Sequence, residues 1–115
     1  MANVWVDTAA MKIQVDLANK LVADGVISSD LLIDADFTDF RQVMQTLCEM
    51  YPKMILWGTD SPAYSFFCVR REGTDRTSVF EFKGTYEDEI AALHCLSVDL
   101  QAKVSGANIL AFLGM

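Results

Sequence analysis

Apolar residues follow two different periods in the first quarter of the chain. Residues 2–6 form a short apolar, β-branched run, and residues 9–25 then carry apolar side chains at helical spacing. Gly25 ends this pattern, as glycine commonly does after a helix. Asp7 or Thr8 is expected to cap the helix, because both side chains accept hydrogen bonds from free N–H groups. The pattern therefore predicts a buried strand followed by an amphipathic helix.

The same order recurs further along the chain. Asp36 or Thr38 begins a predicted second helix, which Pro52 ends, and the apolar residues 53–57 follow as a second buried strand. Strands separated by helices pair in parallel, because a return in the same direction needs a crossover connection. Two parallel strands cannot close a barrel or complete an open sheet, so we expect a fragment of a larger α/β architecture.

A hairpin and several helix starts complete the predicted elements. Residues 64–69 and 77–82 are rich in β-forming side chains and flank a turn-like segment, which predicts a hairpin. Thr85 and Asp88 have the spacing of a capping box and predict a helix after the hairpin.

The C-terminal part is predicted to hold two short helices. Ser97 is expected to cap a helix that stops at Gly106, and Asn108 to cap a last helix over residues 109–113. No linker or low-complexity tract divides the sequence. Residues 1–115 are therefore predicted to form a single α/β unit.

Composition excludes several classes of partner. The formal net charge is −7, which disfavours nucleic acid and anionic membranes. No apolar stretch reaches the roughly 20 residues that cross a bilayer. Apolar residues make up 52% of the 115 positions, which suggests surface that meets another strand or chain. The three cysteines, Cys48, Cys68 and Cys95, have no metal-binding or disulfide spacing and predict reduced thiols in a cytoplasmic protein.

Asp60 is the candidate for chemistry. It follows a predicted buried strand, and in α/β barrels the carboxyl ends of strands carry the catalytic groups. Gly58 and Pro62 on either side would hold its carboxylate in one orientation, as a metal ligand or a general base requires. The alternative from the residues alone is a plain turn, in which Asp60 hydrogen-bonds its own backbone beside Thr59 and Ser61.

Three segments together resemble a known family. Residues 54–62 (Met-Ile-Leu-Trp-Gly-Thr-Asp-Ser-Pro) look like the G-[ST]-D-x-P signature that closes the eighth strand of the amidohydrolase-related metal-dependent hydrolases. Residues 3–9 (Asn-Val-Trp-Val-Asp-Thr-Ala) resemble the seventh strand of that family, and residues 86–110 resemble its closing segment. The resemblance implies a partial (β/α)8 TIM barrel: about the last two βα units, an inserted hairpin and C-terminal helices.

The resemblance also implies a function. In that family the aspartate after the eighth strand, Asp60 here, contributes to a divalent metal centre, zinc first, and accepts a proton from the attacking water. The substrate would be a small molecule that is hydrolysed or decarboxylated. The family's other ligands are histidines of earlier strands, whereas the single histidine, His94, falls on a predicted helix face. We therefore expect the chain to be inactive by itself.

A second function fits the same residues. An apolar-rich chain with unpaired strand edges could be a non-catalytic interaction module that self-associates. Its acidic clusters add no metal site: Asp34, Asp36 and Asp39 lack calcium-loop spacing, and residues 87–89 (Glu-Asp-Glu) open a helix. Both clusters are expected to complement helix dipoles.

Overall fold

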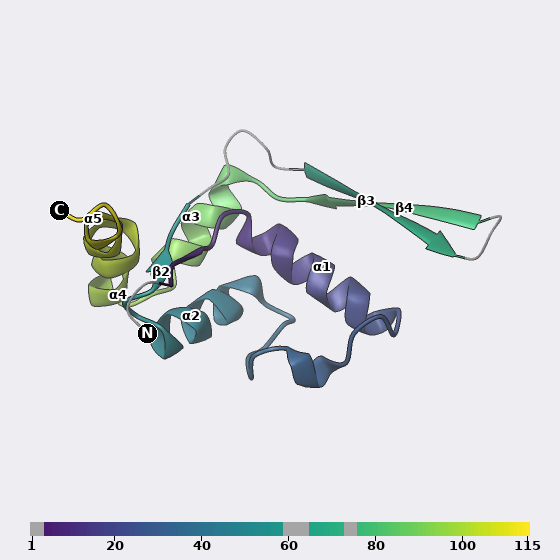
Figure 1. Ribbon diagram of the computed structural model, residues 1–115, viewed down its shortest axis with the longest axis horizontal. Coiled ribbons are helices and arrows are strands. Elements are labelled where there is room, and N and C mark those ends of the chain that lie inside the picture. Colours follow the sequence, from purple (N-terminus) through teal and green to yellow (C-terminus); the bar gives the residue numbers. More distant parts are fainter. Residues whose placement is uncertain (1–3, 59–64, 73–75) are drawn as a thin grey trace.

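The computed structural model describes residues 4–58, 65–72 and 76–115 (Figure 1). In these residues the chain forms a small α/β fold with a two-stranded parallel sheet, and they form no barrel. The elements, in chain order, are β1 (Val6–Asp7), α1 (Met11–Ala23), the 3-10 turn η1 (Ser29–Leu31), α2 (Phe40–Met50), β2 (Ile55–Leu56), β3 (Ser65–Glu72), β4 (Arg76–Lys83), α3 (Tyr86–His94), α4 (Val98–Ala102), the π-helical turn η2 (Lys103–Ala107) and α5 (Asn108–Phe112).

The predicted parallel pairing is confirmed, in a shorter form. β1 and β2 pair with Val6 opposite Ile55 and Asp7 opposite Leu56. Ile55 is fully buried, but Val6 is 38% exposed and Val4 is 46% exposed. The prediction of a buried first strand is therefore wrong, because β1 has a neighbouring strand on one side and none on the other among the described residues.

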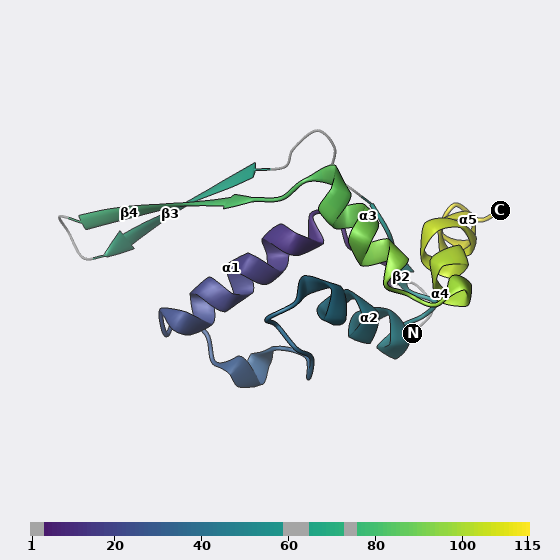
Figure 2. The ribbon, with the colours of Figure 1, turned by 180° about the vertical axis from the view of Figure 1, so that it is seen from behind.

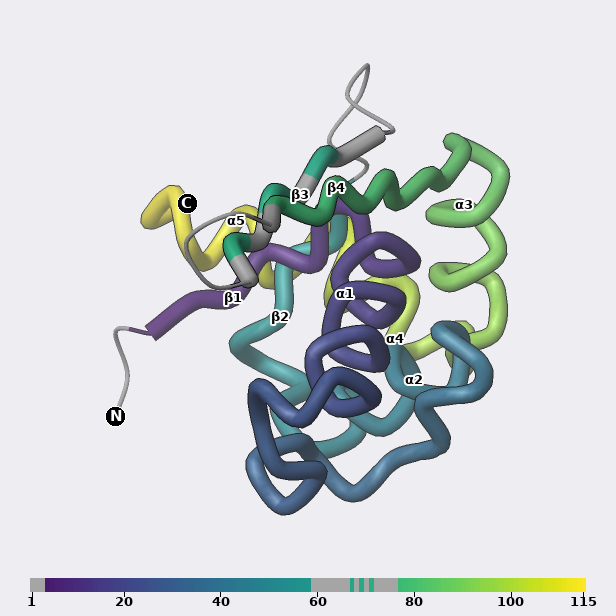
Figure 3. Tube along the Cα trace, turned by 90° about the vertical axis from the view of Figure 1, so that its right-hand side faces the viewer, coloured from purple at the N-terminus to yellow at the C-terminus, as the bar shows by residue number. Residues whose placement is uncertain are grey.

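The core lies where α1, α2 and α3 meet the sheet, and Figure 3 shows these helices gathered beside β2. Met11 and Val15 of α1 contribute to it, as do Met44 and Cys48 of α2. Burying an aliphatic side chain contributes about 1.5–3 kcal/mol, so this cluster is the main source of stability. Its remaining buried members are Val43, Ile55, Ala92, Leu93, Leu96 and Val104.

The predicted hairpin is also confirmed. β3 and β4 are antiparallel, with Val69 opposite Val79, and the hairpin extends away from the helices along the longest axis (Figures 1 and 2). It lies over α1, where the Lys20 Nζ atom sits 4.2 Å from the centre of the Phe80 ring. The radius of gyration is 15.6 Å, above the about 13 Å of a compact chain of this length.

The start of α1 differs from the prediction. Neither Asp7 nor Thr8 caps the helix: the residue at the N-cap is Ala10, which has a left-handed backbone with φ of 56°. The Asp7 Oδ1 atom instead accepts from the Ala9 N–H at 2.8 Å, and the Thr8 hydroxyl donates to the Leu56 carbonyl at 3.3 Å. Both side chains hold the strand end in place, which leaves α1 to be capped from elsewhere.

The C-terminal part forms one continuous helical run, whereas two separate helices were predicted. The chain runs from Val98 through a π-helical turn to Phe112, and Gly106 lies inside that turn without ending the helix. Asn108 does not cap a helix. It lies inside the helical run, and its side chain donates to the carbonyls of Pro52 and Ile55 instead of capping a helix.

Two of the remaining predicted helix caps are confirmed, and the third helix start is shifted. Thr85 and Asp88 form the capping box of α3, with reciprocal bonds of 3.1 and 2.8 Å, and Ser97 caps α4. The second helix begins after Asp39 rather than after Asp36 or Thr38, because the Asp39 carboxylate accepts from the Arg41 N–H at 3.0 Å.

Candidate functional site

The parallel sheet brings the carboxyl ends of β1 and β2 side by side. The Thr8 N–H donates to the Leu56 carbonyl at 2.9 Å, which continues the pairing past both strands. Gly58 then lies so close to Asp7 that a Cβ on it would be 3.1 Å from the Asp7 Oδ1 atom. The backbone that leads to Asp60 therefore starts beside the Asp7 carboxylate.

Asp60 itself lies outside the described residues, as do Thr59, Ser61 and Pro62. Its predicted roles as metal ligand and proton acceptor therefore stay predictions, and so does the alternative of a plain turn. The structure describes the chain up to Gly58, two residues after the end of β2, at the carboxyl edge of the parallel sheet.

The outer edge of β2 is closed by the C-terminal helices. The Trp57 N–H donates to the Val104 carbonyl at 2.9 Å, and the Asn108 side chain donates to the Ile55 carbonyl at 2.9 Å. The same Asn108 amide donates to the Pro52 carbonyl at 2.9 Å. A helical segment therefore occupies the hydrogen-bonding positions where a further strand would pair.

The outer edge of β1 is open. Val6 and Thr8 face β2, so the backbone groups of Trp5 and Asp7 face the other way, and no described residue hydrogen-bonds to them. An unpaired strand edge is a template for another strand. This sheet can thus be extended past β1, whereas extension past β2 requires the helical segment to move.

Glu89 is a buried charged residue in the first turn of α3, with a role at α1 that the sequence did not predict. It is 2% exposed, and its carboxylate accepts from the first N–H groups of α1, Met11 at 3.1 Å and Lys12 at 3.4 Å. Its backbone carbonyl accepts from the indole N–H of Trp57 at 3.1 Å. Glu89 therefore supplies the cap that Ala10 cannot, and it ties α1, α3 and the end of β2 together. A sequence signal existed: Glu89 shares a helix face with the buried Ala92 and Leu93.

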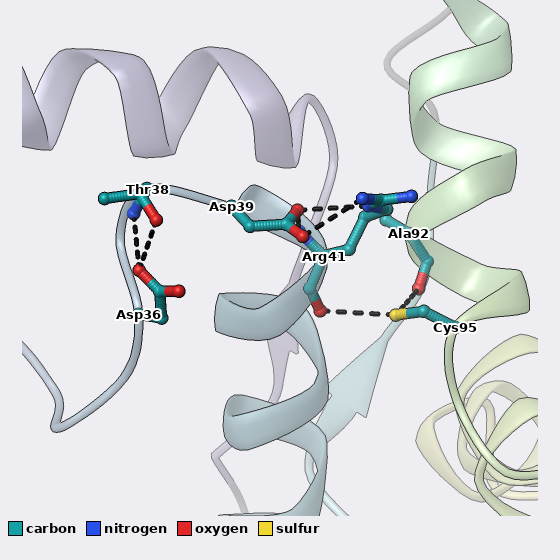
Figure 4. Close-up of polar contacts among 6 residues, drawn as sticks. All are labelled: Asp36, Thr38, Asp39, Arg41, Ala92 and Cys95. Atoms are coloured by element: carbon teal, nitrogen blue, oxygen red, sulfur yellow. Dashed lines mark hydrogen bonds and ion pairs between the residues drawn. The ribbon is translucent and has the colours of Figure 1, made fainter.

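The acidic cluster after η1 has local partners (Figure 4). The Asp36 carboxylate accepts from the Thr38 hydroxyl at 2.5 Å and the Thr38 N–H at 3.0 Å, and these bonds lower the pKa of Asp36. The hydrogen bonds from the Arg41 guanidinium and N–H lower the pKa of Asp39. The prediction that this cluster serves a helix start is confirmed for Asp39, the N-cap of α2.

The described thiols and the histidine form no catalytic group. Cys48 is fully buried, and burial raises the pKa of its thiol to about 12. The Cys95 thiol donates to the carbonyls of Arg41 and Ala92 at 3.2 and 3.0 Å (Figure 4). His94 is exposed at the last residue of α3. Cys48 and Cys95 are free thiols.

A divalent metal does not fit the described residues by themselves. A zinc site needs three or more protein ligands as a rule, and no group of three acidic, histidine or cysteine side chains gathers in the described part of the chain. Within the same residues no helix is long and apolar enough to cross a bilayer.

Comparison of the chain with protein families, with curated proteins and with solved structures finds no match.

Proposed function

We propose that this chain is the C-terminal part of a metal-dependent hydrolase of the amidohydrolase-related family, inactive by itself. The full protein would hydrolyse or decarboxylate a small molecule at a divalent metal, zinc first. Asp60 would be the one residue of this chain that acts as metal ligand and proton acceptor. The observation that carries the proposal is the parallel register of β1 and β2, which starts the Asp60 loop beside the end of the neighbouring strand.

The proposal requires the remaining metal ligands to come from other strands of the barrel. The open edge of β1 offers the place where the preceding strand would pair, through the backbone groups of Trp5 and Asp7. The exposed Val4 and Val6 side chains would be covered by the same addition, as strands of an α/β barrel are on both faces.

The proposal also requires a change at β2. A closed barrel of eight strands needs a strand on the outer edge of β2, where Val104 and Asn108 now bind. In the complete barrel, η2 and α5 would therefore shift to cover the end or the outside of the barrel.

The test is to produce the chain alone and joined to the region encoded upstream of it. Amide hydrogen exchange at Trp5 and Asp7 should be fast in the isolated chain and slowed at least about tenfold in the extended protein, because a hydrogen-bonded strand amide exchanges only on opening. Hydrolase activity and stoichiometric zinc should appear only in the extended protein, and Asp60→Asn should abolish activity. An upstream region without histidine pairs, or full activity of the Asp60→Asn variant, contradicts the proposal.

A second candidate is a non-catalytic module that self-associates through the β1 edge. It is favoured by the backbone groups of Trp5 and Asp7, to which no described residue hydrogen-bonds, together with the exposure of Val4 and Val6. Sedimentation should then show a concentration-dependent dimer that Val6→Lys weakens, because a charged side chain on an edge strand opposes pairing. A folded monomer at all concentrations excludes this candidate.

A further inference from the structure

A cavity lies at the amino ends of the two parallel strands. It has a volume of about 520 Å³, within the range of small-molecule sites. Trp5 and Met54, which precede β1 and β2, form one side of it. Ala107 and Ala111 of the C-terminal helices form the other side. The Phe112 ring packs edge-on against the Trp5 ring at 5.7 Å and fixes this aromatic wall.

Two cations line this apolar cavity. Lys53 and Lys103 both contribute to its wall, in a chain whose net charge is −7. Lys103 forms an ion pair with Asp99, whose Oδ2 atom lies 3.2 Å from the Lys103 Nζ atom. Lys53 forms no ion pair with a described residue, so its charge is available to a ligand. The cavity therefore favours an apolar molecule with an anionic group.

Asn108 adds a polar group of a different kind. Its side chain is 6% exposed and lines the cavity, and its amide nitrogen is already bound to the carbonyls of Pro52 and Ile55. The Oδ1 atom is left without a hydrogen-bond partner among the described residues. A buried acceptor without a donor is destabilising, and the hydroxyl of a ligand would supply the missing hydrogen bond. A ligand ammonium could also donate, but the two lysines repel it.

We propose that this cavity binds a small α-hydroxy carboxylate with an apolar or aromatic side chain. The carboxylate faces Lys53 and Lys103, the hydroxyl donates to the Asn108 Oδ1 atom, and the apolar body lies against Trp5. The cavity belongs to the arrangement of η2 and α5 in this chain by itself, and its proposed ligand makes no use of Asp60.

The test compares three ligands of one shape by calorimetry on the full chain: 3-phenyllactate, 3-phenylpropionate and 3-phenylpropan-1-ol. 3-Phenyllactate should bind at one site, about fivefold more tightly than 3-phenylpropionate, because it adds one hydrogen bond. 3-Phenylpropan-1-ol, which lacks the charge, should bind more weakly than either acid. Equal affinity for all three ligands, or no saturable binding by folded protein, overturns the proposal.

Two variants and a control locate the site. Lys53→Glu should weaken 3-phenyllactate binding about fivefold by reversing one ion pair. Lys83→Glu makes the same charge change on the exposed end of β4, where Lys83 pairs with Glu81, and should leave binding within about twofold. Ala111→Phe should fill the cavity and abolish binding, with the fold checked by circular dichroism. Equal losses in the two charge variants, or unchanged binding in Ala111→Phe, overturn the proposal.

Discussion

Glu89 offers the sharpest test of how this fold is held together. The substitution Glu89→Ala removes a carboxylate that is 2% exposed and that accepts from the Met11 and Lys12 N–H groups at 3.1 and 3.4 Å. Ala10 has no side-chain acceptor to replace it. The bond from Trp57 goes to the Glu89 backbone carbonyl and is not removed by the substitution.

The expected loss follows from those contacts. A hydrogen bond to a charged group contributes about 1.5–3 kcal/mol, and the longer bond to Lys12 belongs at the low end. Relief of the cost of burying a carboxylate offsets part of the sum. We expect Glu89→Ala to lower the free energy of unfolding by about 3 kcal/mol. Glu89→Gln keeps one acceptor oxygen and should cost about half as much.

Urea unfolding followed by circular dichroism measures both losses. Glu87→Ala is the matched control, because Glu87 is an exposed glutamate in the same turn of α3 and its removal should cost less than about 0.5 kcal/mol. If Glu89→Ala is no more destabilising than Glu87→Ala, the carboxylate does not cap α1 and the reasoning is refuted.

Three further outcomes follow. Ala10→Gly should raise the free energy of unfolding by about 0.5–1 kcal/mol, because glycine adopts the left-handed backbone of Ala10 without strain. Ala18→Gly inside α1 is the control and should lower the free energy of unfolding by about 1 kcal/mol. A loss of stability at both positions would contradict the prediction. Asn108→Ala should cost about 2 kcal/mol in urea unfolding, because two carbonyls lose their donor, and an unchanged midpoint contradicts it. Burial raises the pKa of the Cys48 thiol to about 12, so the contribution of the neutral thiol to stability is lost as the pH rises above about 9 toward 12. In iodoacetamide labelling at mildly alkaline pH, Cys48 should react far more slowly in the folded protein than in urea. Equal labelling rates would contradict this prediction.

Local signals predicted the elements whose partners are close in sequence. The Thr85–Asp88 capping box spans three residues, and its bonds are made within the motif itself. Gly25 lies just after α1 and turns the chain away from the helix with a left-handed φ of 72°, which a glycine adopts without steric cost. The hairpin pairs two segments that are separated by only three positions in the sequence, so their β-forming residues were sufficient to predict it.

Two residues with distant partners have roles that the sequence did not predict. Asn108 is a good N-cap by type, but its amide binds carbonyls at Pro52 and Ile55, more than 50 positions earlier. Glu89 caps a helix that begins 78 positions before it. The helix face shared with Ala92 and Leu93 marks Glu89 as a buried position, but no local pattern identifies these distant partners, because they depend on how the helices and the sheet pack. Asp60 is the reverse case: the sequence motif singles it out, and it lies outside the described residues.

The central claim is that Asp60 belongs to the metal centre of a larger barrel. A crystal structure of this chain joined to its upstream region, grown with zinc, tests it most directly. We expect a strand paired to the edge of β1 and an Asp60 carboxylate oxygen about 2.0–2.2 Å from a zinc ion that histidines of earlier strands also bind. An Asp60 carboxylate that hydrogen-bonds its own turn, away from any metal, would contradict it.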